Sequence, residues 1–195
     1  MLIYLHGFNS SPGSHKAQLL KSAMERRGLG DQYSCPALPH LPDLAVVAIE
    51  AEIARYPHDT ITLIGSSLGG FYATYLAERH QLRAVLINPA VYPHQGLRTF
   101  LGAQSNLHTH EQYVLTEEHL RQLERLYRPD IDAGRYLLLV ETLDEVLDYR
   151  EAVAKYAGSK QIVIEGGDHS LKSFPEHIPL ILDFARLSRP QLRQP

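Results

Sequence analysis

The sequence predicts an α/β fold in which helices cover both faces of a mostly parallel sheet of about six strands. Short apolar runs alternate with longer amphipathic stretches along the chain, which is typical of this architecture. Most of the short runs are apolar at nearly every position, and this pattern indicates strands that are buried on both faces. A length of 195 residues fits one domain, so we expect a single three-layer domain over residues 1–195.

Six apolar runs are expected to form the strands, at residues 2–5, 33–35, 60–64, 84–87, 136–140 and 162–164. Apolar residues at helical spacing predict helices at residues 16–27, 42–55, 71–79, 116–125, 145–156 and 175–185. Gly28 after the first helix and Pro42 at the start of the second are typical helix-end residues. Strands therefore alternate with helices, which favours parallel strand pairs.

One stretch, residues 89–134, is too long for a simple connection between two elements. It contains one convincing helix and the histidines His94, His108, His110 and His119. Stretches of this length inside a compact domain often form a lid over a site. We therefore predict a small cap insertion at residues 89–134, between two strands that are neighbours in the sheet.

The composition argues against several classes of protein. The net charge is −3 and no basic stripe is present, which argues against a nucleic-acid binder. No run of about eighteen apolar residues occurs, so no membrane span is expected. The N-terminus lacks a basic segment and a cleavage site, so the expected location is the cytoplasm. Cys35 is the only cysteine, which excludes an internal disulfide or a cysteine zinc cluster, and we expect no metal and no organic cofactor.

The pattern G-x-S-x-G occurs at residues 65–69, directly after a predicted strand and before a helix. This pattern places the serine on a turn so sharp that side chains two residues away on either side would collide. Both of those positions are glycine for Ser67 but not for Ser66, so Ser67 is the candidate nucleophile. The pattern alone is weak evidence, because chance produces it in roughly one chain in fifteen of this length. A glycine-rich turn that serves packing only is the alternative.

A serine hydroxyl needs a base, and in proteins with this turn the base is a histidine late in the chain. His169 follows the last predicted strand, in a loop with two glycines, and is the candidate base. The histidine needs a carboxylate to orient it. Asp144 follows the strand at 136–140 and is the candidate acid, although it also stands where a helix cap is expected, and Glu141 is a competing acid. The order Ser67, Asp144, His169 is the order typical of this type of site.

The tetrahedral intermediate of such a reaction needs N–H donors for its oxyanion. The backbone N–H of Leu68, directly after the candidate nucleophile, is one expected donor. The second is expected from Phe8, in the loop after the first strand. Leu97, Phe100, Leu101 and Leu107 of the cap are expected to supply apolar wall for an acyl chain, the alternative being that they pack the cap onto the body of the domain. The other candidate pocket residues are His6, Gly7, Asn9 and Asn88.

Five blocks of the sequence together resemble those of the YqiA-type bacterial esterases, a small family of α/β-hydrolases. The blocks are LHGFNSSP at 5–12, GSSLGGFYA at 65–73, NPA at 88–90, DEVLDY at 144–149 and GGDHS at 166–170. The resemblance covers nearly the whole chain. It implies a minimal α/β-hydrolase fold without the first two strands of larger relatives, with Ser67, Asp144 and His169 as the catalytic triad. It also implies esterase activity on short acyl esters, with acyl-CoA thioesters as a second substrate class.

The sequence therefore predicts a serine hydrolase that cleaves carboxylic esters or acyl-CoA thioesters through an acyl-enzyme intermediate. Its expected partner is a small-molecule acyl ester or acyl-CoA, and neither a nucleic acid nor a membrane. The alternative is a catalytically weak α/β-hydrolase scaffold that acts as a small-molecule binding module. An intact triad argues against this alternative, because a binding module has no need of all three residues.

Overall fold

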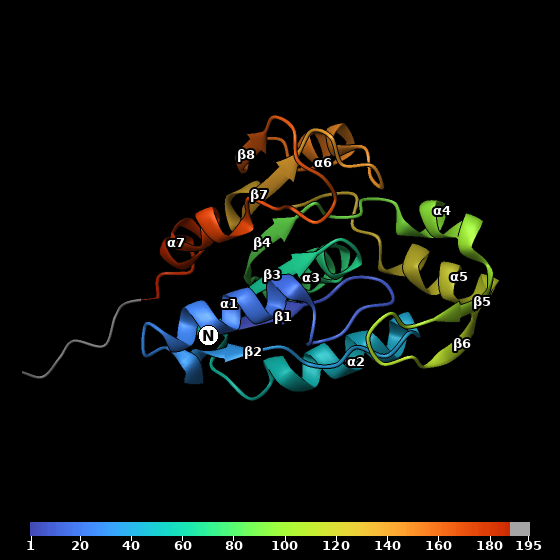
Figure 1. Cartoon of the computed structure of the whole chain (residues 1–195), viewed down its shortest axis with the longest axis horizontal. Helices are drawn as coiled ribbons and strands as arrows, with labels where there is room; N and C mark the ends of the chain where they lie inside the picture. The colour runs from blue at the N-terminus through green and yellow to red at the C-terminus, as the bar shows by residue number, and fades with distance from the viewer. Residues whose placement is uncertain (188–195) are drawn as a thin grey trace, which may run out of the picture.

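The computed structural model describes residues 1–187, so residues 188–195 of the predicted domain lie outside the described part. A six-stranded sheet forms its centre, in the order β2-β1-β3-β4-β7-β8 (Figure 1). The strands are β1 (Leu2–Leu5), β2 (Tyr33–Ser34), β3 (Thr62–Ser66), β4 (Arg83–Ile87), β7 (Tyr136–Glu141) and β8 (Lys160–Ile164). Every neighbouring pair in this sheet is parallel, which confirms the predicted fold class.

Helices cover both faces of the sheet (Figure 1). Two lie on one face and three on the other: α1 (His15–Glu25) and α7 (Phe174–Phe184), and then α2 (Pro42–Ile53), α3 (Leu68–His80) and α6 (Tyr149–Lys155). Strand β1 shows why its sequence is apolar throughout. Leu2 and Tyr4 pack among the residues of the α1 face, whereas Ile3 and Leu5 pack on the α3 face. Alternate side chains of a strand point to opposite faces, so a covered sheet buries them all.

The segment predicted as a cap lies at the carboxyl edge of the sheet, beyond the arrowheads of the central strands in Figure 1. Its elements are α4 (Pro93–Gly96), η3 (Leu97–Phe100), β5 (Gly102–Ser105), β6 (Gln112–Leu115), α5 (Glu117–Leu126) and η4 (Ala133–Arg135). Strands β5 and β6 form an antiparallel hairpin, which the sequence analysis did not predict. The strands that flank the segment, β4 and β7, are neighbours in the sheet as predicted. In residues 1–187, no helix is long and apolar enough to cross a membrane.

Two predicted boundaries move for identifiable reasons. The strand expected at 60–64 begins at Thr62, because His58–Thr60 form the short helix η2. A similar short helix, η1 (Gly30–Gln32), precedes β2. The helix expected at 145–156 begins at Tyr149. There the carboxylate of Asp144 accepts hydrogen bonds from the N–H groups two and three residues further on, both at 2.9 Å, and holds a turn instead.

The turn between β3 and α3 is tighter than predicted. Strand β3 continues to Ser66 and α3 begins at Leu68, so Ser67 alone connects them. A Cβ added to Gly69 would lie 2.0 Å from the carbonyl oxygen of Leu5, and one added to Gly65 would lie 2.3 Å from the oxygen of Gly69. The helix therefore contacts the backbone of β1 directly, and the two glycines of the motif make this close approach possible.

We expect Gly69→Ala to lower the free energy of unfolding by more than about 3 kcal/mol, because the added methyl group must displace the backbone of β1. Gly96→Ala is the matched control. The backbone of Gly96 is helical, with φ of −62°, and no atom lies within 4 Å of its added Cβ. The control should change the free energy by no more than about 1 kcal/mol. Urea unfolding of both variants measures the difference, and equal effects would contradict the steric account.

Candidate active site

Ser67 has a backbone conformation that non-glycine residues seldom adopt, with φ of 54° and ψ of −121°. Its N–H donates to the carbonyl oxygen of Ile87 at 3.0 Å, and its own carbonyl oxygen accepts from Ala90 at 3.1 Å. These bonds tie the turn to the end of β4. Ser66 is buried, whereas Ser67 is partly exposed. The structure therefore exposes Ser67 and not Ser66, and the positions of the two glycines select the same serine.

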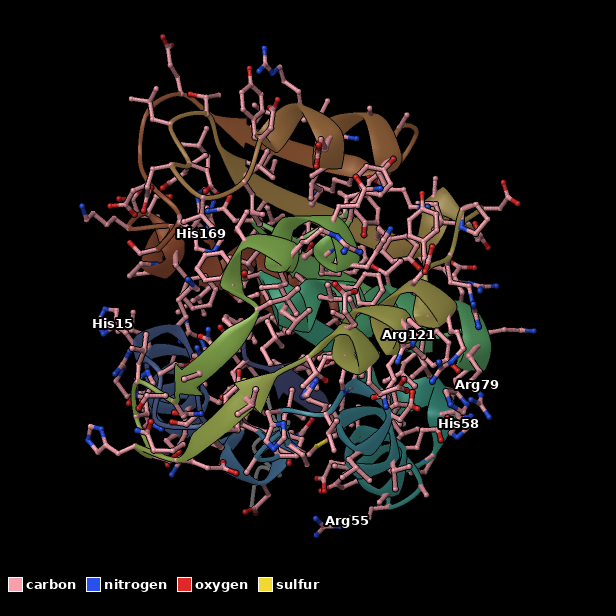
Figure 2. All side chains as sticks on the ribbon, turned by 90° about the vertical axis from the view of Figure 1, so that its right-hand side faces the viewer. His15, Arg55, His58, Arg79, Arg121 and His169 are labelled. Carbon is pink, nitrogen blue, oxygen red and sulfur yellow. The ribbon has the colours of Figure 1, made fainter. Side chains whose placement is uncertain are left out.

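Asp144 and His169 come together from the loops that follow β7 and β8. The Nδ1 atom of His169 lies 2.8 Å from the Oδ2 atom of Asp144. The Asp144 side chain is 2% exposed and the His169 side chain 23% exposed. Burial alone would raise the pKa of Asp144, but hydrogen bonds from His169 and from two backbone N–H groups outweigh it and lower that pKa. Asp144 thus presents a charged acceptor to the imidazole. Figure 2, which looks onto the carboxyl edge of the sheet, labels His169.

Glu141, the competing acid, has a different role. It is the last residue of β7, and its side chain points into the interior, with 1% of the residue exposed. Its Oε2 atom accepts from the N–H of Asp168 at 2.7 Å, and its Oε1 atom accepts from the hydroxyl of Ser173 at 2.6 Å. The carboxylate therefore holds both ends of the loop that carries His169. It also fills the space beside Gly167, where an added Cβ would lie 2.0 Å from Oε2.

Asn88 was expected in the pocket, but its side chain forms hydrogen bonds with the loop that carries His169. The residue is buried, and its Nδ2 atom donates to the carbonyl oxygens of Asp168 and His169 at 3.1 and 3.2 Å. Its Oδ1 atom accepts from the N–H of Glu141 at 3.0 Å. Asn88 therefore links the ends of β4 and β7 to the His169 loop. Sequence analysis missed this role of Asn88 and Glu141, although polar residues at the ends of buried strands were a signal for it.

Two further charged residues contact the His169 loop from outside. Lys16, on α1, donates from Nζ to the carbonyl oxygen of Ser170 at 2.8 Å, and burial lowers the pKa of this lysine. Glu145 accepts from the backbone N–H of His169 at 2.9 Å. Neither was singled out as a loop contact from the sequence. Together they fix the backbone on both sides of the imidazole.

The loop after β1 lies against the nucleophile turn. A Cβ added to Gly7 would lie 3.2 Å from the Cβ of Ser67 and 3.7 Å from its Oγ. Phe8 follows in this loop, and Leu68 is the first residue of α3, where a backbone N–H has no acceptor within the helix. Within residues 1–187, no backbone acceptor outside the regular helices and strands is found for the N–H of Phe8 or of Leu68. Leu68 is next to Ser67 in the chain, and Phe8 lines a cavity together with these two residues.

His6, another expected pocket residue, forms hydrogen bonds that hold this loop. Its Nε2 atom accepts from the N–H of Leu38 at 3.1 Å, so in the neutral imidazole the proton is on Nδ1, which lies 3.1 Å from the oxygen of Gly7. Burial lowers the pKa of His6, which favours this neutral form. His6, Gly7 and Asn9 line a cavity of only about 40 Å³, together with Phe8 and Leu68 among others.

A larger cavity of about 430 Å³ opens beside Ser67. Leu97 and Phe100 line it, whereas Leu101 and Leu107 do not. Its other lining residues are Phe8, Ser67, Leu68, Ala90, Val91, Tyr92, Pro93, Gln95, Gly96, Val146, Leu147, Asp148 and Glu151.

A cavity of about 470 Å³ lies elsewhere, beside Met1, Thr62 and Arg83, and is lined by none of the candidate residues. Among residues 1–187, no group of three or more histidines, cysteines and carboxylates is arranged to hold a metal.

Solved structures of known proteins share this fold. Mouse alpha/beta hydrolase domain-containing protein 10 superposes with a TM-score of 0.69 at 16% identity, over 96% of this chain and 90% of its own. A monoacylglycerol lipase from Paleococcus ferrophilus gives 0.64 at 18% identity, over 94% and 93%. These likenesses show the α/β-hydrolase fold.

The sequence comparisons extend over the same length. The protein YcfP of Salmonella arizonae is 25% identical over 193 residues, which cover 96% of this chain and 99% of YcfP. A family model described as "Uncharacterised protein family (UPF0227)" matches residues 1–186. The resemblance to the YqiA-type proteins is confirmed: the chain belongs to the uncharacterised protein family UPF0227, the family of YcfP and YqiA.

Proposed function

We propose that this protein is a serine hydrolase that cleaves carboxylic esters or acyl-CoA thioesters, with Ser67 as nucleophile, His169 as base and Asp144 as the orienting acid. The observation that carries the proposal is the 2.8 Å hydrogen bond between Asp144 and His169, formed at the sheet edge where Ser67 lies partly exposed on a strained turn. Because Asp144 accepts from Nδ1, the Nε2 atom of His169 is left free to take a proton.

The reaction follows from these roles. The Nε2 atom of His169 takes the proton of the Ser67 hydroxyl while Oγ bonds to the carbonyl carbon of the substrate. The carbon–oxygen or carbon–sulfur bond then breaks, and the leaving group receives that proton. A water molecule, deprotonated by His169, releases the acid and restores Ser67. The N–H groups of Phe8 and Leu68 stabilise the oxyanion at both steps.

The cavity beside Ser67 supports an acyl substrate. Its wall is largely apolar, with Val91, Leu97 and Phe100 among the lining residues. An acyl chain that enters it gains about 0.8 kcal/mol for each buried methylene. The lipase named among the structural neighbours acts through the same general fold, and this supports an ester as the substrate class. Esters and thioesters share the acyl-enzyme chemistry, so the proposal includes both.

Removing the nucleophile tests the proposal directly. We expect Ser67→Ala to reduce kcat for a short p-nitrophenyl ester on the order of 10⁶-fold, because the acyl-enzyme cannot form. Ser66→Ala is the control. It should retain most activity, because Ser66 is buried and its hydroxyl is not accessible to a substrate. Full activity in Ser67→Ala, or equal losses in the two variants, would contradict the assignment. A binding module would show no Ser67-dependent turnover of any ester.

The apolar wall predicts a dependence on chain length. We expect Phe100→Ala to lower kcat/KM for an octanoyl ester about tenfold, because the chain loses contact worth one or two methylenes, while the acetyl ester changes less than about twofold. Leu107→Ala is the control, because Leu107 is 76% exposed and lies outside the cavity. A proportional loss for all esters in Phe100→Ala would show that the residue only supports the fold.

A further inference from the structure

The β5–β6 hairpin is hydrogen-bonded to the loop that follows β1. The hydroxyl of Tyr113 donates to the Oδ1 atom of Asn9 at 2.7 Å, and the Nδ2 atom of Asn9 donates to Gln104 at 3.1 Å. Two more bonds reach the backbone of this loop: the N–H of Leu107 donates to the carbonyl oxygen of Asn9 at 2.9 Å, and the side-chain Nδ2 atom of Asn106 donates to the carbonyl oxygen of Ser10 at 2.8 Å. Both strands of the hairpin thus contact the side chain of Asn9.

Asn9 is the residue that sets the path of the loop after Phe8. Its φ of 50° lies in the left-handed region, which asparagine tolerates better than most residues. The ring of Phe8 also contacts the segment predicted as a cap: it packs edge to face against Phe100 of η3, with centroids 6.1 Å apart. The hydrogen bonds from the hairpin to Asn9, and not only the sheet, therefore hold the conformation that presents the N–H of Phe8.

Tyr113 is itself held by a stack of rings. It lies parallel to His40 with centroids 4.3 Å apart, and the Nδ1 atom of His40 is 3.1 Å from the Nε2 atom of His119. The Nδ1 atom of His119 accepts from the N–H of Thr116 in the capping box of α5, so Nε2 donates to His40. Burial, with a smaller contribution from Glu111, raises the pKa of Tyr113 to about 12. The hydroxyl therefore stays protonated and donates at neutral pH.

We propose that Tyr113 is a positioning residue for the oxyanion hole: through the side chain of Asn9, its hydroxyl holds the Phe8–Asn9 loop so that the N–H of Phe8 faces the intermediate on Ser67. The effect on turnover rests on the proposed function, whereas the effect on the loop does not. In consequence the hairpin is not a lid that opens independently of the site, because lifting it breaks the bonds that shape the donor loop.

The test is Tyr113→Phe, which removes the hydroxyl and keeps the ring stacked on His40. We expect kcat to fall about tenfold with KM within about twofold of wild type, because a displaced oxyanion donor affects the transition state more than the bound ester. Gln112→Ala is the matched control. Its amide bonds to Ser105 and His110 within the hairpin and is exposed, so its loss should leave kcat unchanged.

A double-mutant cycle with Asn9→Gly, which keeps the left-handed backbone but removes the acceptor, separates positioning from general destabilisation. Both single variants should lose the same bond, so the double variant should be no slower than the worse single one. Wild-type kcat in Tyr113→Phe, a loss confined to KM, or additive losses would each overturn the proposal.

Hydrogen exchange of the peptide spanning residues 7–11 gives a readout that does not require an esterase. It should speed up in Tyr113→Phe and not in Gln112→Ala, because only the first variant loses a bond to the loop. If wild type hydrolyses no ester, the proposed function fails while this comparison still decides whether Tyr113 holds the loop. Unchanged exchange in Tyr113→Phe would overturn the inference.

Discussion

The hydrogen bond between Asp144 and His169 is the interaction around which the carboxyl edge of the sheet is organised. It joins the loops after two neighbouring strands, β7 and β8, and it needs both loops to turn sharply. Asp144 makes its turn by accepting two backbone N–H groups with its other oxygen, and the His169 loop turns at Gly166 and Gly167, with φ of 88° and 72°. One carboxylate oxygen of Asp144 thus holds the turn, and the other accepts a hydrogen bond from His169.

Buried polar side chains hold the loops at this edge of the sheet. Glu141 is almost completely removed from water, and a buried carboxylate is tolerated only when donors satisfy it. Its donors are groups of the His169 loop, and Asn88 extends the same network to β4. The half-buried side chains of Asn9 and Tyr113 form a similar hydrogen bond that holds the loop after β1. The chemistry proposed for this edge therefore depends on loops that are hydrogen-bonded from two directions.

The parts of this arrangement that depend on local sterics could be predicted from the sequence. A Cβ added to Gly69 or Gly65 would lie 2.0 or 2.3 Å from a backbone oxygen, which no side chain permits, so the glycines on either side of Ser67 identify the position of the turn. The choice between Asp144 and Glu141 could not be made in the same way. It depends on β7 ending at Glu141, one residue beyond the predicted strand, which turns that carboxylate into the interior.

The hairpin was missed for a different reason. Residues 102–105 read Gly-Ala-Gln-Ser, without the β-branched or alternating residues that are typical of strands. The contact that gives the hairpin its importance joins Tyr113 to Asn9, 104 residues away, and no local pattern reports such a pair. Asn88 and Asn9, both expected to face a substrate, instead use their amides to join loops, which only the three-dimensional structure could show.

The measurement that tests the central claim most directly is a comparison of Asp144→Asn with Glu141→Gln in single-turnover and steady-state ester hydrolysis. Asp144→Asn should reduce kcat about 10⁴-fold, because the amide no longer fixes the tautomer of His169 or stabilises the imidazolium. Glu141→Gln keeps one acceptor for the loop and should cost less than about tenfold, with a lower free energy of unfolding. Equal losses, or a greater loss of kcat in Glu141→Gln, would contradict the account.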